Sequence, residues 1–350
     1  MKITHCTNAW LAAFLTTLLN VGFLMAQDPV LGWAGEAYVS AGSAQINRLN
    51  YLNRTVTDRV LGYCPGGIDD SHGCCPKAGV NCGTHDWNYW ISGYGLDGGV
   101  SVQDSVGRYN YTVGGLLLGV DCGNDALKYG AFYGYGQTTV GAEIAELQSK
   151  DHTLGAYAKW DSLYGGGYSF ALLDFSFGSY EGTQNILATN FDVNYDGWQA
   201  ALLLEKGWKY KNVYGGYVNP FIDLQYLSYY SDAFEDDFLQ YGAIDIDSLR
   251  TILGFRLWQN FCYKNTLRIG VGGALAWHHE LLDTDGLFIA NYEQVPFPVV
   301  GNGGGRDWIE MSLAGSLDIT HDITLSGNYY LYFNQYTTIN AGMATLTWRR

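Results

Sequence analysis

Residues 267–278 read LRIGVGGALAWH, and this stretch decides the fold. Every second position from Leu267 to Trp277 is apolar or Gly, ending in an aromatic ring, whereas the intervening positions from Arg268 to His278 are small or charged. Successive side chains of a β-strand point to opposite faces. The period of two therefore predicts a strand with one apolar and one small or polar face, as in a β-barrel wall that separates lipid from a wet lumen.

The same alternation recurs along the chain from Trp87 onward. It is clear at 218–226, 309–317 and 323–331, and weaker segments begin near Trp87, Tyr109, Leu127, Thr153, Tyr168, Gly197, Ser248 and Ile339. Together these make about twelve strands of about ten residues, the length that a tilted strand needs to cross a bilayer. We therefore expect an all-β fold over residues 87–350, an antiparallel transmembrane β-barrel of about twelve strands.

The composition is typical of such a barrel. The chain has 46 Gly, 28 Tyr and 11 Trp among 350 residues, with only 15% charged residues and a formal net charge of -15. Tyr and Trp favour the two membrane interfaces. Because Lys and Arg are outnumbered 19 to 34 by Asp and Glu, nucleic acid is not expected as a partner, since neutralising phosphates requires cationic side chains.

The predicted connections alternate in length. Long ones fall at 97–107, 137–150, 179–196, 231–247 and 281–305, and short ones at 122–126, 162–166, 211–216, 260–265 and 318–322; only 334–337 breaks the alternation. Outer-membrane barrels have short periplasmic turns and longer extracellular loops. A soluble β-sandwich also alternates its side chains, but nothing in it requires loop lengths to alternate by side. The pattern favours the cell outer membrane.

Residues 1–26 are predicted to be a signal peptide. Lys2 supplies a small basic region, the run from Ala9 to Ala26 is apolar, and Gln27 and Asp28 follow it. The alternative is a membrane-anchoring helix, because the run is about long enough to span a bilayer.

Residues 27–86 form a short segment before the barrel, with a helix at 36–62 and a Cys-rich loop at 63–86. At 1.5 Å per residue the helix is roughly 40 Å long, enough to thread a pore through a bilayer. Its charged residues suit a wet lumen and are the pore-helix candidates Arg48, Arg54, Asp58 and Arg59. The alternative is an amphipathic helix that lies on the periplasmic mouth.

Several segments resemble strands of the autotransporter β-domain, the C-terminal part of type V secretion proteins. They are WISGYG at 90–95, YTVGGLLLGV at 111–120, KYGAFYGYG at 128–136, LGAYAKW at 154–160, NPFIDLQY at 219–226, AWHHEL at 276–281 and GMATLTW at 342–348. The resemblance implies a translocator barrel that the outer-membrane barrel assembly machinery and periplasmic chaperones insert, and that presents an N-terminal passenger outside the cell. Resembling proteins also keep a helix in the pore.

Two features depart from that family. Its members usually end on an aromatic residue, whereas here Arg349 and Arg350 follow Trp348. Residues 27–86 leave room only for a passenger remnant or linker.

The cysteines beyond residue 26 predict disulfides, because their number is even and the chain is expected to be exported. The candidates are Cys64, Cys74, Cys75, Cys82, Cys122 and Cys262. Our hypothesis is a disulfide-bonded cap at 64–82 across the periplasmic mouth, with further bridges that join it to the turns at Cys122 and Cys262. A metal site with His72 or His85 is the alternative, although the cysteine spacing lacks the paired pattern of zinc knuckles.

Charged residues at inward positions are expected to line the pore: Lys159, Glu205, Asp223, Arg250, Arg256, Arg268 and Glu310. The arginines fall on strands eight and nine and the acids elsewhere, so they could produce a transverse field that orients the helix or selects small ions. The alternative is simple solvation of the lumen, with charges paired across the barrel.

No catalytic residue, cofactor or metal is predicted. His278, His279 and Glu280 lie together, but adjacent strand residues face opposite ways, and no nucleophile elbow accompanies them. We expect a monomeric translocator-type barrel in outer-membrane lipid, whose surface activity lies in the loops, chiefly 281–305. The alternatives are a small porin-like channel, a surface adhesin and, last, a barrel hydrolase.

Overall fold

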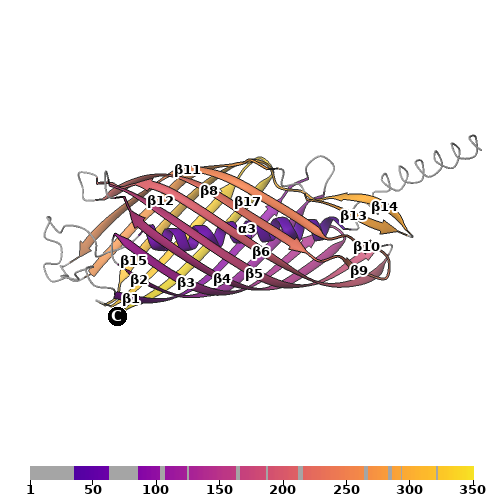
Figure 1. Ribbon diagram of the computed structural model, residues 1–350, viewed down its shortest axis with the longest axis horizontal. Helices are drawn as coiled ribbons and strands as arrows, with labels where there is room; N and C mark the ends of the chain where they lie inside the picture. The colour runs from indigo at the N-terminus through magenta and orange to yellow at the C-terminus, as the bar shows by residue number, and fades with distance from the viewer. Residues whose placement is uncertain are drawn as a thin grey trace, which may run out of the picture.

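The computed structural model describes residues 35–62, 86–102, 107–123, 126–162, 166–186, 188–211, 216–263, 267–282, 286–292, 294–320 and 322–350. Helix α3 (Glu36–Gly62) lies inside a barrel of long tilted strands, as Figure 1 shows. These bounds are the range predicted from the sequence. Among the described residues, no helix has the length and hydropathy to span a membrane. The predicted signal peptide and Cys-rich loop lie outside the described ranges.

Twelve strands form the wall within the described ranges. They are β1 (Asp86–Val100), β2 (Tyr109–Gly123), β3 (Leu127–Ala142), β4 (Ala145–Asp161), β5 (Gly167–Ile186), β6 (Thr189–Trp208), β8 (Tyr217–Ser231), β11 (Ile244–Tyr263), β12 (Leu267–Glu280), β15 (Asp307–Asp318), β16 (Ile323–Phe333) and β17 (Thr337–Arg349). The short β7 (Tyr210–Lys211) pairs with β8. The antiparallel barrel predicted from the sequence is confirmed.

The barrel closes where the first wall strand meets the last. β1 pairs antiparallel with β17 from Asn88↔Arg349 to Val100↔Thr337, and β8 joins β6 to β11. A strand edge exposed to lipid would leave its N–H and C=O groups without partners, and closure removes such edges. The termini of the barrel domain therefore lie together at one end.

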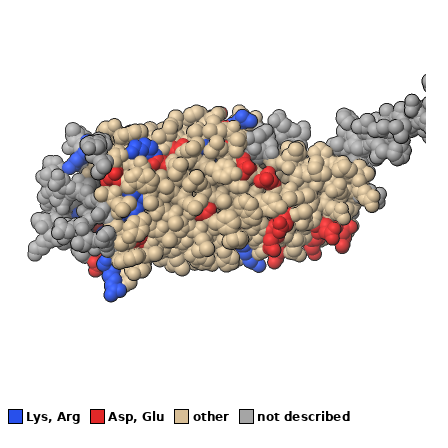
Figure 2. Space-filling model, in the orientation of Figure 1, with Lys and Arg blue, Asp and Glu red and all other residues tan. Residues whose placement is uncertain are grey.

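The wall has an apolar outer belt and a polar inner face. Large apolar side chains stand exposed on the outside of nearly every wall strand, for example Leu116, Leu154, Leu173, Leu204, Leu224, Phe255, Val271, Leu313 and Leu346. Their sequence neighbours point inward and are buried, as Glu310 and Ser312 are on β15. On the face shown in Figure 2, most of the outward surface between the two ends is uncharged, with scattered charged side chains. This is the two-faced wall that the alternation predicted.

The two ends of the barrel differ in their connections. At the turn end, where β1 begins and β17 ends, the connections are 124–126, 162–166, 209–216, 264–266 and 319–322. At the opposite end, called the loop end, the longest connections are 232–243 and 281–306.

Two predicted long loops are in fact extended hairpins at the loop end. β3 pairs with β4 as far as Gly141↔Glu146, and β5 pairs with β6 as far as Ile186↔Thr189. Outward side chains in these extensions are polar, such as Glu181. Where the outer face contacts water it need not be apolar, so the period of two disappears from the sequence although the strands continue.

A small sheet covers the loop end around the start of α3. Its strands are β9 (Phe234–Glu235), β10 (Gln240–Tyr241), β13 (Leu287–Tyr292) and β14 (Val295–Val300), in the order β14-β13-β10-β9. The Tyr38 ring of α3 packs edge-on against Phe234 and Tyr241, with centroids 5.2 and 5.1 Å away. The first turn of the helix is thereby held beneath the predicted 281–305 loop.

Substitution of Leu313 by Arg tests the lipid-facing belt. Leu313 is 70% exposed on the outer face of β15, so the charge would stand in hydrocarbon and destabilise the barrel by about 2–4 kcal/mol. The matched control is Gln148→Arg, on the polar extension of β4, which should leave stability unchanged. Equilibrium unfolding in lipid vesicles measures both, and equal effects would contradict a lipid-facing belt at Leu313.

Candidate functional site: the lumen and its helix

Helix α3 fills the lumen in close contact with the wall. Almost all its described side chains are buried, and Glu36 in the first turn and Arg59 in the last suit the helix dipole. A Cβ atom on Gly42 would lie only 2.6 Å from the Ile246 side chain and 2.9 Å from Tyr229. The helix therefore needs Gly at this position to approach the wall.

The centre of the helix is held by Arg54, whose side chain is completely buried. Its Nη1 donates to Asp223 Oδ2 at 2.9 Å, and its Nη2 and Nε donate to Glu310 Oε1 at 3.1 and 3.3 Å. The Phe221 ring lies 4.9 Å from the guanidinium carbon. A buried cation without partners is very costly, so this set of partners fixes the position of the helix.

A second cluster surrounds Asp58, one turn further along. Arg256 Nε and the Tyr330 hydroxyl each donate to Asp58 at 2.8 Å. Arg256 also forms a bidentate pair with Glu205, at 2.7 and 2.9 Å, and Tyr168 donates to the same carboxylate at 2.6 Å. The acid of the helix and an acid of the wall thus share one wall arginine.

The remaining arginines of the helix also have wall partners. Arg48 donates to Gln199 Oε1 at 2.7 Å and lies 3.8 Å from Asp151. Arg59 pairs with Asp121 at 2.5 Å and donates to the Tyr157 hydroxyl at 3.1 Å, and its guanidinium lies 4.4 Å from the Trp90 ring. Every predicted pore-helix residue therefore contacts the wall.

The structure brings four of the predicted pore-lining residues to the centre and leaves three elsewhere. Glu205, Asp223, Arg256 and Glu310 surround Arg54 and Asp58. Arg250 instead pairs with Glu280 at 3.0 Å at the loop end, and Lys159 pairs with Asp161 at 2.6 Å at the turn end. Arg268 is half-buried near the start of β12. Arg250 and Arg256 contact different sets of neighbours, so these two do not form one positive face.

Several lumen residues were missed by the sequence analysis: Asp121, Asp151, Tyr168, Gln199, Glu280 and Tyr330. Each lies at an inward position of its strand. The period-two alternation of side chains could have identified these positions from the sequence. His278, considered as a catalytic residue and rejected, is hydrogen-bonded through Nε2 to Glu310 at 2.8 Å. His279 points outward and bonds Asp307 at 2.9 Å, so the two histidines lie on opposite faces, as the alternation requires.

Of the cysteines, Cys122 is described with a buried free thiol, which does not agree with the suggested bridge at this turn. Cys64, Cys74, Cys75 and Cys82 lie outside the described residues, as do His72 and His85, and the Cys262 side chain is not described. In the described part of the chain, no group of three or more His, Cys, Asp or Glu residues could hold a metal ion.

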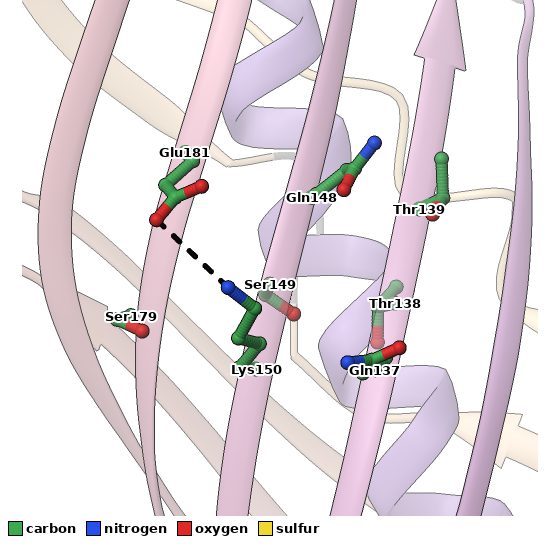
Figure 3. Close-up of a pocket in the computed structure, with 8 residues that line it drawn as sticks. All are labelled: Gln137, Thr138, Thr139, Gln148, Ser149, Lys150, Ser179 and Glu181. Atoms are coloured by element: carbon green, nitrogen blue, oxygen red, sulfur yellow. Dashed lines mark ion pairs between the residues drawn. The ribbon is translucent and has the colours of Figure 1, made fainter.

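A shallow depression on the outside of the wall has no features of a binding site. Gln137, Gln148 and Ser179 line it, and Lys150 and Glu181 point toward one another across it, 4.0 Å apart (Figure 3). Both charged side chains are more than half exposed, and exposed pairs of this kind contribute little. The helix lies behind these strands (Figure 3).

Comparison with known proteins decides the family. The model of the autotransporter β-domain matches residues 89–330, which cover most of the wall. The chain belongs to the autotransporter β-domain family. Autotransporter β-domains are outer-membrane barrels inserted by the barrel assembly machinery. In such barrels the short turns are periplasmic, so the turn end of this autotransporter β-domain faces the periplasm and the loop end faces outward.

Solved structures share the fold. The translocator domain of the autotransporter NalP from Neisseria meningitidis has a TM-score of 0.68 at 15% identity, over 90% of this chain and 99% of that one. The β-domain of the Bordetella autotransporter BrkA has a TM-score of 0.56 at 16% identity, over 75% and 99%.

An extracellular serine protease of Serratia marcescens is 25% identical over 338 residues. The match includes 90% of this chain but only 30% of that protein.

Glu36 makes the extracellular end of the helix sensitive to pH. Its carboxylate lies beside Gly107, whose amide donates to it, and is buried under the loop end. Burial raises the pKa of Glu36 to about 7, and the nearby Glu143 adds to this rise. A raised pKa means that docking of this helix end is strongest below pH 4.5 and weakens as the pH rises through 7.

Substitution of Glu36 by Gln should remove this dependence. In the unaltered chain, hydrogen exchange of amides in the first turns of α3 should accelerate by about tenfold or more between pH 5 and pH 8 beyond the intrinsic chemical change. In the Gln variant the corrected rates should be equal at both pH values. Amides near Asp58, further along α3, serve as the internal control, and a variant that kept the full pH effect would refute the assignment to Glu36.

Proposed function

We propose that this chain is a translocator that delivers the polypeptide preceding Gly35 to the cell surface and then retains α3 in its lumen as a plug. The proposal goes beyond family membership, because the chain spans less than a third of its curated relatives. Residues 1–26 would act as the signal peptide and 27–86 as the passenger remnant or linker.

The direction of α3 carries the proposal. Its first turn contacts the outer cap through Tyr38, while Arg59 in its last turn contacts Asp121 and Trp90 near the periplasmic end. The chain therefore enters the lumen from outside, runs through it and begins the barrel at the periplasmic end. A segment attached before Gly35 then lies outside the cell while it is still joined to its anchor.

The packing of the lumen disfavours the porin-like alternative. Arg48, Arg54 and Arg59 are bound to different strands of the wall, and the aromatic cap covers the outer mouth. We also propose that the barrel is monomeric, that periplasmic chaperones deliver it and that it has no catalytic activity, since the two histidines considered point to opposite faces of the wall.

An epitope inserted directly before Gly35 tests the topology. Antibody added to intact cells should bind it, because the helix begins at the extracellular mouth. The control is the same epitope in the 319–322 turn, which should be reached only after the outer membrane is permeabilised. In planar bilayers the same chain should conduct far less than an open pore. An epitope before Gly35 that antibody does not reach in intact cells, or a steady open channel, would favour the porin-like alternative.

One observation supports a second role as a surface interaction protein. The β13–β14 hairpin presents an apolar outer face, on which Leu287 and Ile289 are 58% and 47% exposed and Val300 is 43% exposed. Its opposite face is fixed onto α3 and β10 through buried Phe288 and Val299. Rigid exposed apolar patches of this kind mark protein contacts.

The double variant Leu287→Ser and Ile289→Ser tests this role. Cells that display it should adhere to each other or to protein-coated surfaces less than half as well as cells with the unaltered chain, about the loss expected when an apolar contact is removed. Leu313→Ser, on the membrane belt, is the matched control. Unchanged adhesion would rule out the hairpin as an interaction surface.

A further inference from the structure

The wall around Arg54 has the features of a receptor for one planar cation. The carboxylates come from different strands, Asp223 from β8 and Glu310 from β15, and together they accept from three N–H groups of one guanidinium. Phe221 supplies an aromatic face 4.9 Å from the guanidinium carbon. Guanidinium matches such a combination through its planar fork of donors and its affinity for aromatic faces.

Neighbouring wall residues hold this receptor in place independently of the helix arginine. His278 holds Glu310 at 2.8 Å. Arg256 lies 3.9 Å from the Phe221 ring and is itself bound to Glu205 at 2.7 Å. Glu310 and the Phe221 ring are therefore positioned by contacts within the wall.

Arginine is the only cationic side chain that the helix brings to the acids of the wall. Residues 36–62 contain Arg48, Arg54 and Arg59 and no lysine. An ammonium group is a compact point charge and cannot span two carboxylates while lying against a ring. The wall lysines Lys128 and Lys159 pair with acids near the periplasmic end instead.

We propose that Asp223, Glu310 and Phe221 form a guanidinium-binding site that selects arginine over lysine and stops the chain in the lumen when Arg54 reaches it. The inference rests on the proposed function, because it names the class of side chain that the lumen retains. A passing segment without an arginine at this point meets two buried carboxylates without a cation to neutralise them, an unfavourable state. Arrival of Arg54 removes that cost.

The full-length Arg54→Ala variant, refolded with either methylguanidinium or methylammonium chloride, tests the site. The alanine variant alone should show a raised conductance in planar bilayers. Millimolar methylguanidinium should restore the closed state at a concentration about tenfold lower than methylammonium, because only the former reproduces the fork and the planar face. Arg54→Lys should remain open without either compound.

Each contrary result overturns the proposal. The first is an Arg54→Ala variant whose conductance is low without added cation. The second is an Arg54→Lys variant whose conductance is as low as that of the unaltered chain. The third is restoration of the closed state by the two cations at the same concentration. Should the alanine variant refold poorly, the yield of barrel with heat-modifiable electrophoretic mobility becomes the measurement, and methylguanidinium but not methylammonium should raise it. The epitope before Gly35 reports on the proposed function separately, because its accessibility in the unaltered chain does not depend on which cation the site prefers.

Discussion

Closure of the wall by β1 and β17 is the constraint on which the rest of the structure depends. Inside a bilayer no water satisfies an exposed N–H or C=O group, so a sheet can cross only when its last strand pairs with its first. Pairing from Asn88↔Arg349 to Val100↔Thr337 achieves this. Once the sheet is closed, every wall strand has one face toward lipid and one toward an enclosed space, and the sequence must suit both.

The enclosed space imposes a second requirement, because charged groups in it must find partners. Wall acids such as Asp223 and Glu310 are buried among few wall cations at the centre of the lumen, and Arg256 is already shared by Glu205 and Asp58. Helix α3 supplies the missing cation with Arg54. Removing one partner of a buried pair is far more costly than the pair itself is stabilising. The polar helix and polar wall are therefore parts of one electrostatic unit.

How much of this could be predicted from sequence differs from one feature to the next. The strands near Leu267 and Ile309 were predictable because lipid on one side and the lumen on the other require their side chains to alternate. Helix α3 was predictable because the spacing of its apolar residues and the residues at its two ends are local signals. The hairpin extensions around 143 and 187 were not, since water outside the membrane places no demand on their outer face. The pairing of Asp58 with Arg256 depends on strand tilt and register across the whole barrel, which no local pattern encodes.

The spacing of the helix arginines explains why the lumen holds a helix and not an extended chain. From Arg48 to Arg59 the chain advances 11 residues, roughly 17 Å as a helix but roughly 36 Å as an extended strand. The wall partners of these residues, Gln199 and Asp121, are fixed in the barrel. Under the proposed function, an extended segment in transit can therefore engage one of the arginine sites at a time, whereas a helix engages all of them together. Formation of the helix and its capture are thus coupled, and the final state is favoured over every intermediate position of the chain.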